Sequence, residues 1–505
     1  MTSVIIAGLG PVGGTLAALL GAQGVRTVVV EPNLRPYPKP RAAVLEIESI
    51  RLLSLIPGLA PRDEWSVPMA RNGVVGPDRR PLFLLEQRAE AYGLPQIVRI
   101  DQPALESALR AAIAAMPSVE VLTGRAVQTV SQTEDEVAVT LDDGRRLTAS
   151  WLVGCDGTTG TVRTQAGIPF TGDTFAQPWL VVDALTTATT ETGVDGTTNG
   201  NPTVAFVLDP ARPAVAMSSP GRWRWEWMLL PGEQPAAMTS DETVHELVAP
   251  WTDPDRLKIE RAAVFTFHAR MADHWRAGRV LLAGDAAHAM PPFAGAGLGM
   301  GIRDAGALAW RLAAAARPAA HDAAPAAKPA APHVAEVAGL DGYERERRPD
   351  VAKTIKMALR IGRVLQTRNR AAALMFRGLT RALNAVPGLQ SRLGDRPLPP
   401  RHLPRAVAGP LPRAGHVLPN PRVSVAGGPP TRLDEVIGYR WAFIGNACDP
   451  RREKAPDAVY LTLNLADPPP DCLAIEDLDG LLDPTPGTIT AVRPDRFLLG
   501  THKTS

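Results

Sequence analysis

Val4-Ile-Ile-Ala-Gly-Leu-Gly-Pro-Val-Gly13 is the stretch of sequence that decides the fold. Its four apolar residues predict a short buried strand, and the glycine-rich turn leads into an apolar helical run over residues 15–23. A second apolar run over residues 27–30 predicts another strand, which ends at Glu31. Together these segments predict a β-α-β unit of about 30 residues.

Each glycine of the turn has its own predicted part in binding a dinucleotide. Gly8 permits the tight turn, Gly10 lets the backbone approach a pyrophosphate, and Gly13 lets the helix pack closely on the strand. The start of the helix, at Pro11 and Val12, offers partial positive charge to the phosphates, and its unpaired N–H groups begin at Val12, because proline has none.

Glu31 follows the turn by about 20 residues, a position from which its carboxylate can accept hydrogen bonds from ribose hydroxyls. The acid argues against NADP in this site, because a 2′-phosphate would meet a carboxylate. The turn alone does not distinguish FAD from NAD. A glycine-rich turn that binds no ligand is the alternative.

The bulk composition narrows the class of protein. A chain of 505 residues, 45% hydrophobic and 21% charged, predicts roughly two to four domains with sizeable cores. The net charge of +2 gives no electrostatic case for binding nucleic acid or an anionic membrane. The three cysteines form no CxxC pair and predict neither a disulfide framework nor a metal site. Without a long apolar run or a signal segment, we expect a cytoplasmic protein.

A second motif lies far downstream of the first. Residues 278–288, GRVLLAGDAAH, run from an apolar strand into a turn, and residues 290–301, MPPFAGAGLGMG, lead into a helix over 302–315. These residues resemble the GD motif of the flavoprotein aromatic hydroxylases, the single-component FAD monooxygenases related to p-hydroxybenzoate hydroxylase. The resemblance implies that Asp285 bonds the FAD ribitol. It also implies that the stretch beside the isoalloxazine supplies Pro292, Gly295, Gly297, Leu298 and Gly299. A buried aspartate that caps a helix is the alternative.

A third motif, Cys155-Asp-Gly-Thr-Thr-Gly-Thr-Val-Arg163, is similar to the DG motif of the same family. That similarity implies that Asp156 and Arg163 contact FAD and the nicotinamide cofactor, whereas a structural turn with an ion pair is the alternative. Arg41 and Gln102 match family positions near the flavin and its ribitol or phosphates. Without the resemblance, both would pass as surface polar residues.

The resemblance covers nearly the whole chain and is closest to the 3-(3-hydroxyphenyl)propionate hydroxylase branch. The stretches that carry it begin at Trp179, Met228, Phe265, Tyr343 and Val492. One departure is Gly295-Ala296-Gly297, where the branch usually has Gly-Gln-Gly. The C-terminal residues resemble a thioredoxin fold that has lost its redox cysteines.

The expected fold is α/β, with a Rossmann-type FAD-binding domain of the glutathione-reductase kind. That domain is discontinuous, over residues 1–178 and 271–395, and contains a flexible Ala/Pro insertion at 316–333. An interleaved, sheet-rich substrate domain is expected over 179–270, a linker arm over 396–430, and a thioredoxin-like domain without CxxC over 431–505. Further expected elements are helices at 103–115 and 343–365, the latter kinked or restarted at Pro349, and strands at 136–141 and 147–153.

Arg222-Trp-Arg-Trp-Glu-Trp227 alternates with period two, so its three tryptophans share one face of a strand. That face could form one wall of a pocket for an aromatic ligand, but packing of the tryptophans in the core is the preferred interpretation. His268 and His288 invite a catalytic role, although a structural histidine is the more common case.

The resemblance implies an FAD-dependent monooxygenase for which NADH or NADPH is a transient co-substrate. O2 would form a flavin C4a-hydroperoxide, which hydroxylates a small phenolic substrate resembling 3-(3-hydroxyphenyl)propionate. The sequence identifies no catalytic base, and a monomer or homodimer is expected. Alternatives are an oxygenase of hydroxylase, epoxidase or Baeyer–Villiger type that acts on a polyketide, an FAD-dependent dehydrogenase or halogenase, and a non-catalytic flavin-binding protein.

Overall fold

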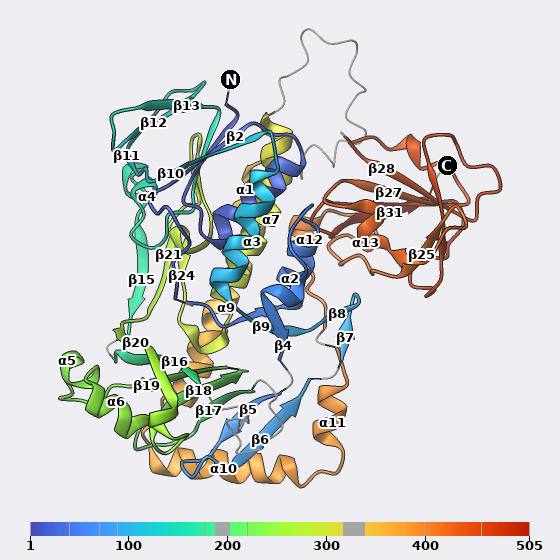
Figure 1. Cartoon of the computed structure of the whole chain (residues 1–505). Helices are drawn as coiled ribbons and strands as arrows, with labels where there is room; N and C mark the ends of the chain where they lie inside the picture. The colour runs from blue at the N-terminus through green and yellow to red at the C-terminus, as the bar shows by residue number, and fades with distance from the viewer. Residues whose placement is uncertain are drawn as a thin grey trace.

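The computed structural model describes residues 2–503 except 40, 70, 88, 176, 187–202, 220, 317–338, 398 and 456. The Ala/Pro insertion expected at 316–333 therefore lies outside the described residues apart from its first. The described chain has a mixed α/β fold with three large sheets, the third of them near the C-terminus, and four smaller ones (Figure 1). None of its helices is long and apolar enough to cross a bilayer.

The first sheet has six strands in the order β10-β2-β1-β14-β23-β22. Its first five strands are parallel, and β22 pairs antiparallel with β23. The strands are β1 (Val4–Ala7), β2 (Thr27–Glu31), β10 (Val119–Thr123), β14 (Trp151–Gly154), β22 (Arg276–Ala277) and β23 (Val280–Leu282). The predicted β-α-β unit is confirmed, since β1 and β2 are parallel neighbours on either side of helix α1 (Pro11–Ala22) in the chain.

The single strand predicted at 147–153 is wrong. Two separate strands replace it, and Ser150 lies between them. β13 (Arg146–Ala149) pairs with β12 (Val137–Leu141), whereas β14 belongs to the six-stranded sheet. Strand β11 (Val127–Gln132) completes a small antiparallel sheet with β12 and β13. One apolar run thus serves two sheets, which local sequence alone does not reveal.

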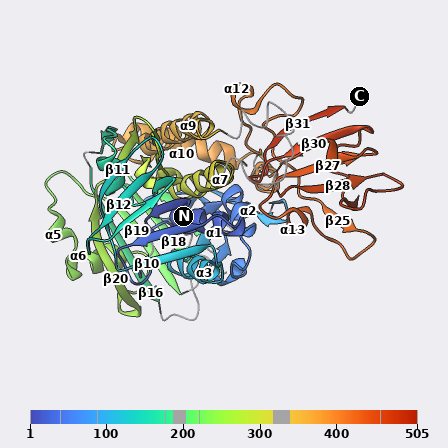
Figure 2. The ribbon, with the colours of Figure 1, turned by 90° about the horizontal axis from the view of Figure 1, so that it is seen from above.

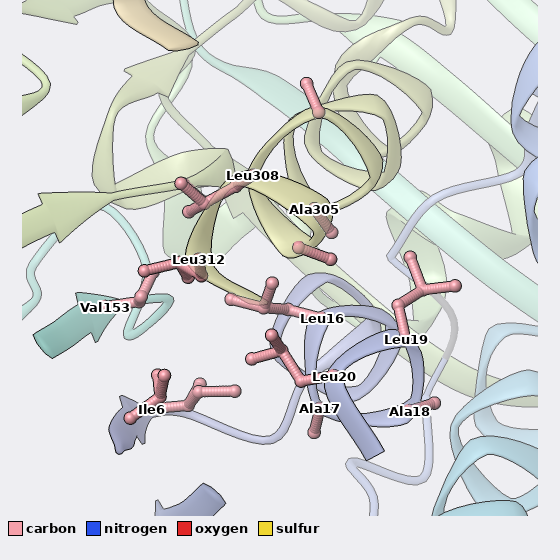
Figure 3. Packing of buried hydrophobic residues seen from close by; sticks show 14 of the residues in the cluster. Ile6, Leu16, Ala17, Ala18, Leu19, Leu20, Val153, Ala305, Leu308 and Leu312 are labelled. Atoms are coloured by element: carbon pink, nitrogen blue, oxygen red, sulfur yellow. The ribbon is translucent and has the colours of Figure 1, made fainter. Parts of the chain in front are cut away.

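Helix α7 (Gly297–Ala316) packs on α1 over the six-stranded sheet. Figure 3 shows Leu16 of α1 between the two helices, close to Ala305 and Leu312 of α7. Both helices begin about one turn before the predicted starts, because their glycine-rich first turns are already helical. Helices α2 (Ile47–Ser54) and α3 (Gln102–Ala114) also pack here, α2 against α7 and α3 against α1.

The second large sheet has seven strands in the order β20-β16-β19-β18-β17-β5-β6. Five of them fall within the predicted substrate domain: β16 (Trp179–Thr186), β17 (Thr203–Val207), β18 (Ala214–Ser219), β19 (Arg222–Met228) and β20 (Leu257–Phe265). The other two, β5 (Arg71–Val75) and β6 (Pro81–Glu86), come from residues expected in the FAD-binding domain. The boundary expected at residue 179 therefore leaves out two strands.

The three tryptophans of β19 share one face, as the alternation predicts, and they stack with ring centroids 5.0 and 6.1 Å apart. They are buried in one apolar cluster with Met238 of α5 (Pro235–Met238) and with Val244 and Val248 of α6 (Asp241–Val248). The preferred interpretation, packing in the core, is confirmed.

Smaller strands and helices connect the sheets. β15 (Phe170–Thr174), β21 (His268–Ala272) and β24 (His288–Ala289) form one three-stranded sheet, and β3 (Val44–Glu46), β4 (Ser66–Pro68) and β9 (Ile97–Ile100) form another. Helix α9 (Asp341–Leu365) continues through Pro349, so the alternative of a helix restart there is wrong. Helices α10 (Arg370–Asn384) and α11 (Leu389–Gly394) follow and contact β6.

The C-terminal sheet lies to one side of the molecule (Figures 1 and 2). Its order is β26-β25-β29-β28-β27-β30-β31, with helix α13 (Leu433–Ile437) following β26 in the chain. The strands are β25 (Arg422–Val425), β26 (Thr431–Arg432), β27 (Ala442–Asn446), β28 (Val459–Leu463), β29 (Leu473–Asp477), β30 (Thr488–Val492) and β31 (Leu498–Lys503). Strand β25 comes from the predicted linker arm at 396–430, so this part of the arm belongs to the sheet.

Two buried carboxylates join the C-terminal sheet region to the rest of the chain. Asp434 of α13 accepts from Arg51 of α2 at 2.7 and 2.9 Å and from Arg496 at 2.6 Å. Glu346 of α9 accepts from Arg493 at 2.9 and 3.0 Å and from Arg311 of α7 at 2.8 Å. Burial alone would raise the pKa of each carboxyl, but the paired arginines lower both pKa values to about 2.

We predict that Asp434→Asn destabilises the folded chain by about 3–5 kcal/mol, because two buried guanidinium groups lose their shared counter-ion. Urea unfolding measures the change. Asp479→Asn is the control, since its ion pair with Arg422 lies at the surface, where ion pairs contribute little to stability. Equal effects of the two substitutions would contradict the assigned importance of Asp434.

The contacts of Asp434 with Arg51 and Arg496 also predict how the stability of the fold depends on pH. A carboxyl with a depressed pKa stabilises the fold above its unfolded pKa of about 4, and this stabilisation is lost as the pH falls toward about 2. The free energy of unfolding of the wild type should therefore decrease between about pH 4 and about pH 2. In Asp434→Asn the contribution of this carboxyl to the decrease should be absent, as urea unfolding at several pH values can show.

Candidate active site

The predicted motifs meet at one edge of the six-stranded sheet. Gly8 follows β1, Glu31 ends β2, Asp156 lies just after β14, and Asp285 lies just after β23. Because these four strands are parallel, their carboxyl ends lie together. This is the edge at which open α/β sheets bind ligands.

The glycine turn has the geometry that its sequence predicts. Gly8 has a φ of +100°, and a Cβ there would lie 2.5 Å from the carbonyl oxygen of Cys155. A Cβ on Gly13 would lie 2.0 Å from the carbonyl oxygen of Gly8, so only glycine permits this packing. Gly10 differs, because a Cβ there meets no atom within 4 Å. Its outer side is open to a ligand at the N-terminus of α1.

Glu31 has a structural contact that the sequence did not suggest. Its carboxylate accepts from the backbone N–H of Leu9 at 2.7 Å and from both nitrogens of Asn33 at 2.9 and 2.7 Å. The buried side chain thus fixes the turn.

Asp285 is exposed although the residues on both sides of it are buried. It lies in a 3-10 turn (Gly284–Ala286) directly after β23. Desolvation by the surrounding protein atoms raises the pKa of this carboxyl. The nearby His288 and Arg41 lower the pKa, but by less. An exposed carboxyl at the end of a buried strand suits a hydroxyl-bearing ligand.

Val12 brings the two distant motifs together. A Cβ on Gly284, which has a φ of +62°, would lie 2.9 Å from Cγ2 of Val12, and a Cβ on Gly301 would lie 2.5 Å from the same atom. The first helical turn of α1 therefore fits against the turn after β23 and against α7. Glycines in both motifs are required for this close approach.

Asp304 of α7 anchors the second motif, and sequence reasoning missed it. Its carboxylate accepts from the backbone N–H of Gly284 at 3.1 Å and from Arg347 at 2.8 Å, and it lies 2.6 Å from Nε2 of His288. Burial alone would raise its pKa, but His288 and Arg347 hold it below the usual value. The signal in the sequence was a lone acid on an apolar helix. These contacts, with complete burial, support the structural interpretation of His288.

The glycine-rich segment before α7 is shaped by its contacts with β3 and α2. Gly295 has a φ of +61°, and a Cβ there would lie 2.6 Å from Val44. A Cβ on Gly299 would lie 2.1 Å from the carboxylate of Glu46, and Ser49 donates to the Gly299 carbonyl at 3.1 Å. Pro292 is exposed, Gly297 and Leu298 are half-buried, and the first N–H groups of α7 precede its intrahelical bonds.

Gln102 is buried, so the interpretation as a surface polar residue is wrong for it. Its Oε1 accepts from the backbone N–H of Ala42 at 2.8 Å and of Arg41 at 3.3 Å, and its Nε2 donates to Glu106 at 2.8 Å. Gln102 therefore holds the segment that carries Arg41. The Arg41 guanidinium is exposed and lies 4.7 Å from the ring centre of Tyr37.

The contacts of the third motif fit a structural turn, but they do not include the ion pair between Asp156 and Arg163 that this alternative names. Asp156 accepts from the backbone N–H of Val162 at 2.9 Å, at the start of helix α4 (Thr161–Gln165). Arg163 donates to the carbonyls of Ile168 and Thr158 and lies over the ring of Phe170. The two side chains hold different parts of the turn.

An aromatic layer lies between the glycine-rich segment and the seven-stranded sheet. The ring of Phe293 lies 5.7 Å from that of Trp179, 5.8 Å from that of Phe175 and 6.0 Å from that of Phe267, all as tilted or edge-on pairs. His268 lies outside this cluster, with Nδ1 3.0 Å from the hydroxyl of Thr174. This buried aromatic layer packs the segment that leads into α7 against the seven-stranded sheet.

A family model described as FAD binding domain matches residues 1–358. The chain belongs to this FAD-binding family. A second model, described as HcaD C-terminal domain, matches residues 415–505. This match begins within the predicted linker arm, in agreement with the position of β25.

Two curated relatives share the name 3-(3-hydroxy-phenyl)propionate/3-hydroxycinnamic acid hydroxylase. The protein of Mycolicibacterium smegmatis is 31% identical over 535 residues, which cover 98% of this chain and 90% of the relative. The protein of Burkholderia cenocepacia is 33% identical over 471 residues, which cover 89% and 80%. The predicted resemblance to the FAD-dependent aromatic hydroxylases is confirmed, and so is FAD as the cofactor.

Solved structures show the same fold at lower identity. The flavin-dependent monooxygenase PieE, in complex with FAD and substrate, has a TM-score of 0.74 at 19% identity over 99% of this chain and 96% of its own. Aklavinone-11 hydroxylase with FAD and aklavinone has a TM-score of 0.73 at 20% identity over 99% and 95%. The mixed α/β fold is therefore that of FAD-binding monooxygenases.

The glycine geometry predicts a contrast between two alanine variants of this FAD-binding protein. Gly10→Ala should fold normally, because its Cβ meets no protein atom, yet bind FAD at least about tenfold more weakly, or about 1.4 kcal/mol. Gly13→Ala should instead lower the free energy of unfolding by about 1–3 kcal/mol through overpacking.

Flavin fluorescence titration and urea unfolding separate the two effects. Gly378→Ala is the control, since a Cβ on that residue of α10 also meets no atom. Undiminished FAD affinity in Gly10→Ala would contradict the placement of the pyrophosphate.

Proposed function

We propose that this chain is an NAD(P)H-consuming FAD monooxygenase that hydroxylates a small phenolic acid resembling 3-(3-hydroxyphenyl)propionate. The observation that carries the proposal is the aromatic layer around Phe293, a residue of the segment between Asp285 and α7. The curated relatives, at 31% and 33% identity, bear the names of enzymes for such a substrate.

Within this proposal, FAD lies along the edge of the six-stranded sheet. The residues proposed to hold it, directly or by fixing the turns that contact it, are Gly8, Gly10, Pro11, Val12, Gly13, Glu31, Arg41, Gln102, Asp156, Asp285, Pro292, Gly295, Gly297, Leu298 and Gly299. Gln102 would act by holding Arg41, and Asp156 by holding its turn. The N-termini of α1 and α7 would place partial positive charge near anionic groups.

Bound FAD supplies the redox and oxygen chemistry, and NADH or NADPH would be a transient co-substrate. The protein's own residues have to orient the ring and exclude water. The apolar side chains of Trp179, Phe267 and Phe293 suit both tasks, because they exclude solvent and pack against an aromatic ring.

A second candidate is an oxygenase that tailors a polyketide. The structural match to aklavinone-11 hydroxylase over 99% of this chain favours it, and so does Ala296, where a smaller side chain leaves more room than glutamine. A substrate screen that includes both phenolic acids and polycyclic phenols distinguishes the two.

The finer features of the fold belong to the same proposal. The parallel β-α-β sheet supports a Rossmann-type domain. The order β28-β27-β30-β31, with one parallel and two antiparallel pairs, supports a thioredoxin-like C-terminal domain. A monomer or homodimer is proposed, and the exposed Leu374, Met375 and Leu379 of α10 favour the homodimer. A cytoplasmic location fits the use of NAD(P)H.

Asp285→Ala should lose FAD, because the lost polar contacts are worth about 1–3 kcal/mol, or roughly a factor of 5 to 150 in affinity. The flavin-to-protein absorbance ratio after purification measures occupancy, and circular dichroism checks the fold. Asp173→Ala, at an exposed acid of β15, is the matched control. Full FAD retention in Asp285→Ala would contradict the assigned contact.

The activity itself predicts that phenolic acids stimulate NADH or NADPH oxidation by the FAD-loaded enzyme. One oxygen atom from ¹⁸O₂ should appear in the product, as mass spectrometry can show. Stimulation without product would indicate uncoupled peroxide release. Neither stimulation nor product with any phenol would contradict the proposed function.

A further inference from the structure

Four buried charged residues form a cluster on the seven-stranded sheet. Arg224 and Glu226 of β19 alternate with its tryptophans and so project from the opposite face. Asp183 of β16 is paired in register with Arg224 on one side and with Arg261 of β20 on the other. All four residues are at most 8% exposed. The proposed FAD site does not use any of them.

The face that carries this cluster looks toward the flavin-binding residues. Arg224 donates to the backbone carbonyl of Arg41 at 2.9 Å. Trp179, Val215 and Met228, which share the face, belong to the same apolar cluster as Phe293. The tryptophan face of β19 belongs instead to the cluster with α5 and α6. Glu226 therefore points into the space between this sheet and the glycine-rich segment.

Within the cluster, one carboxylate serves two arginines. Oδ1 of Asp183 accepts from Nε of Arg224 at 2.6 Å, and Oδ2 accepts from Nε of Arg261 at 2.8 Å. These three groups carry a net positive charge, which a buried site has to compensate. Glu226 supplies the balancing negative charge.

The Glu226 carboxylate accepts no hydrogen bond from any described residue, although its side chain is in the interior. The residues beside it on the two neighbouring strands are Val181 of β16 and Val215 of β18, whose side chains carry no hydrogen-bond donor. Desolvation raises the pKa of this carboxyl, Arg224 and Arg261 lower it, and Asp183 raises it. A buried carboxylate with free lone pairs and a raised proton affinity is suited to accept a proton from a bound group.

We propose that Glu226 is the base that accepts the phenolic proton of the substrate. The phenol O–H bond breaks, the proton forms a new bond with a Glu226 oxygen, and the electron pair stays on the phenolate oxygen. The step needs no oxidant or reductant, and it leaves the ring electron-rich for hydroxylation. This inference rests on the proposed function, because it requires a phenol at the aromatic layer.

The charge balance explains why this residue is suited to the step. Before transfer, two arginines face two carboxylates, so the cluster is neutral and accepts a neutral phenol. After transfer, Glu226 is neutral and the phenolate carries the negative charge beside Arg224 and Arg261. The cluster and the phenol group together carry no net charge in either state, and the step does not change the side-chain carboxylate of the substrate, so no new net charge has to be desolvated.

Glu226→Gln tests the proposal through binding, without turnover. The variant leaves the cluster with one uncompensated positive charge, so it should bind the phenolate. The Kd of 3-(3-hydroxyphenyl)propionate for the oxidised, FAD-loaded variant should then fall by up to about tenfold per pH unit between pH 6 and 9. The wild-type Kd should stay constant over this range. Glu246→Gln, at an exposed acid of α6, is the control and should behave as wild type.

Turnover provides a second readout. At pH 7, kcat/KM of Glu226→Gln should be lower by about 100-fold, the lower end of the contribution of a positioned base. It should recover toward the wild-type value as the pH approaches about 10, where the phenol ionises by itself. A purely structural defect would not recover with pH.

Several outcomes separate this inference from the proposed function. Wild-type turnover of phenols together with a pH-independent Kd and unchanged kcat/KM in Glu226→Gln would overturn the Glu226 assignment alone. Wild-type enzyme that neither binds nor hydroxylates any phenol would overturn both. If Glu226→Gln fails to retain FAD, Glu226→Asp provides the test instead. Because this variant keeps a carboxylate, its Kd for 3-(3-hydroxyphenyl)propionate should stay independent of pH. A pH-dependent Kd in Glu226→Asp would overturn the assignment.

Discussion

The buried carboxylate of Asp304 is the interaction on which the geometry of the site depends. It joins three segments that are distant in sequence: the turn at Gly284, the helix α7 that contains it, and Arg347 of α9. A buried carboxylate without donors costs several kcal/mol, so these partners are held together as one unit. Gly284 has a left-handed backbone, which glycine adopts without strain, and its N–H donates to Asp304. Asp285, the next residue, is thereby fixed at the edge of the sheet.

Much of this arrangement could be predicted from the sequence because its signals are local. Gly8, Gly13 and Glu31 lie within one strand–turn–helix–strand unit, where spacing alone dictates geometry. Asp304 was missed because nothing local marks it: its partners come from two other segments. Tertiary contacts also decide two other features. Residues 147–153 are divided between two sheets, and β5 and β6 join the seven-stranded sheet, because each strand pairs with a partner that is distant or unmarked in the sequence.

The strand β19 shows the same limit within a single element. Alternation predicts that its tryptophans share one face and its charged residues the other, and this is confirmed. Alternation does not say which face looks toward the proposed flavin-binding residues. The answer comes from α5 and α6, which cover the tryptophans, and from Arg224, which donates to the carbonyl of Arg41 on the other side of the sheet. The residues closest to the proposed chemistry were thus visible in the sequence as the charged half of this alternation, but without any sign of what they would face.

The C-terminal domain has no CxxC pair, yet its contacts give it a part in the architecture of the site. Tyr439 donates to the carbonyl of Gly306, and Trp441 packs edge-on against Trp310, both on α7. Arg493 shares Glu346 with Arg311 of the same helix. Helix α7 is therefore held by Asp304 near its N-terminus and by the C-terminal domain along its later turns. Since the first turn of α7 is the proposed flavin contact, a domain remote from the chemistry can set how rigidly that turn is held.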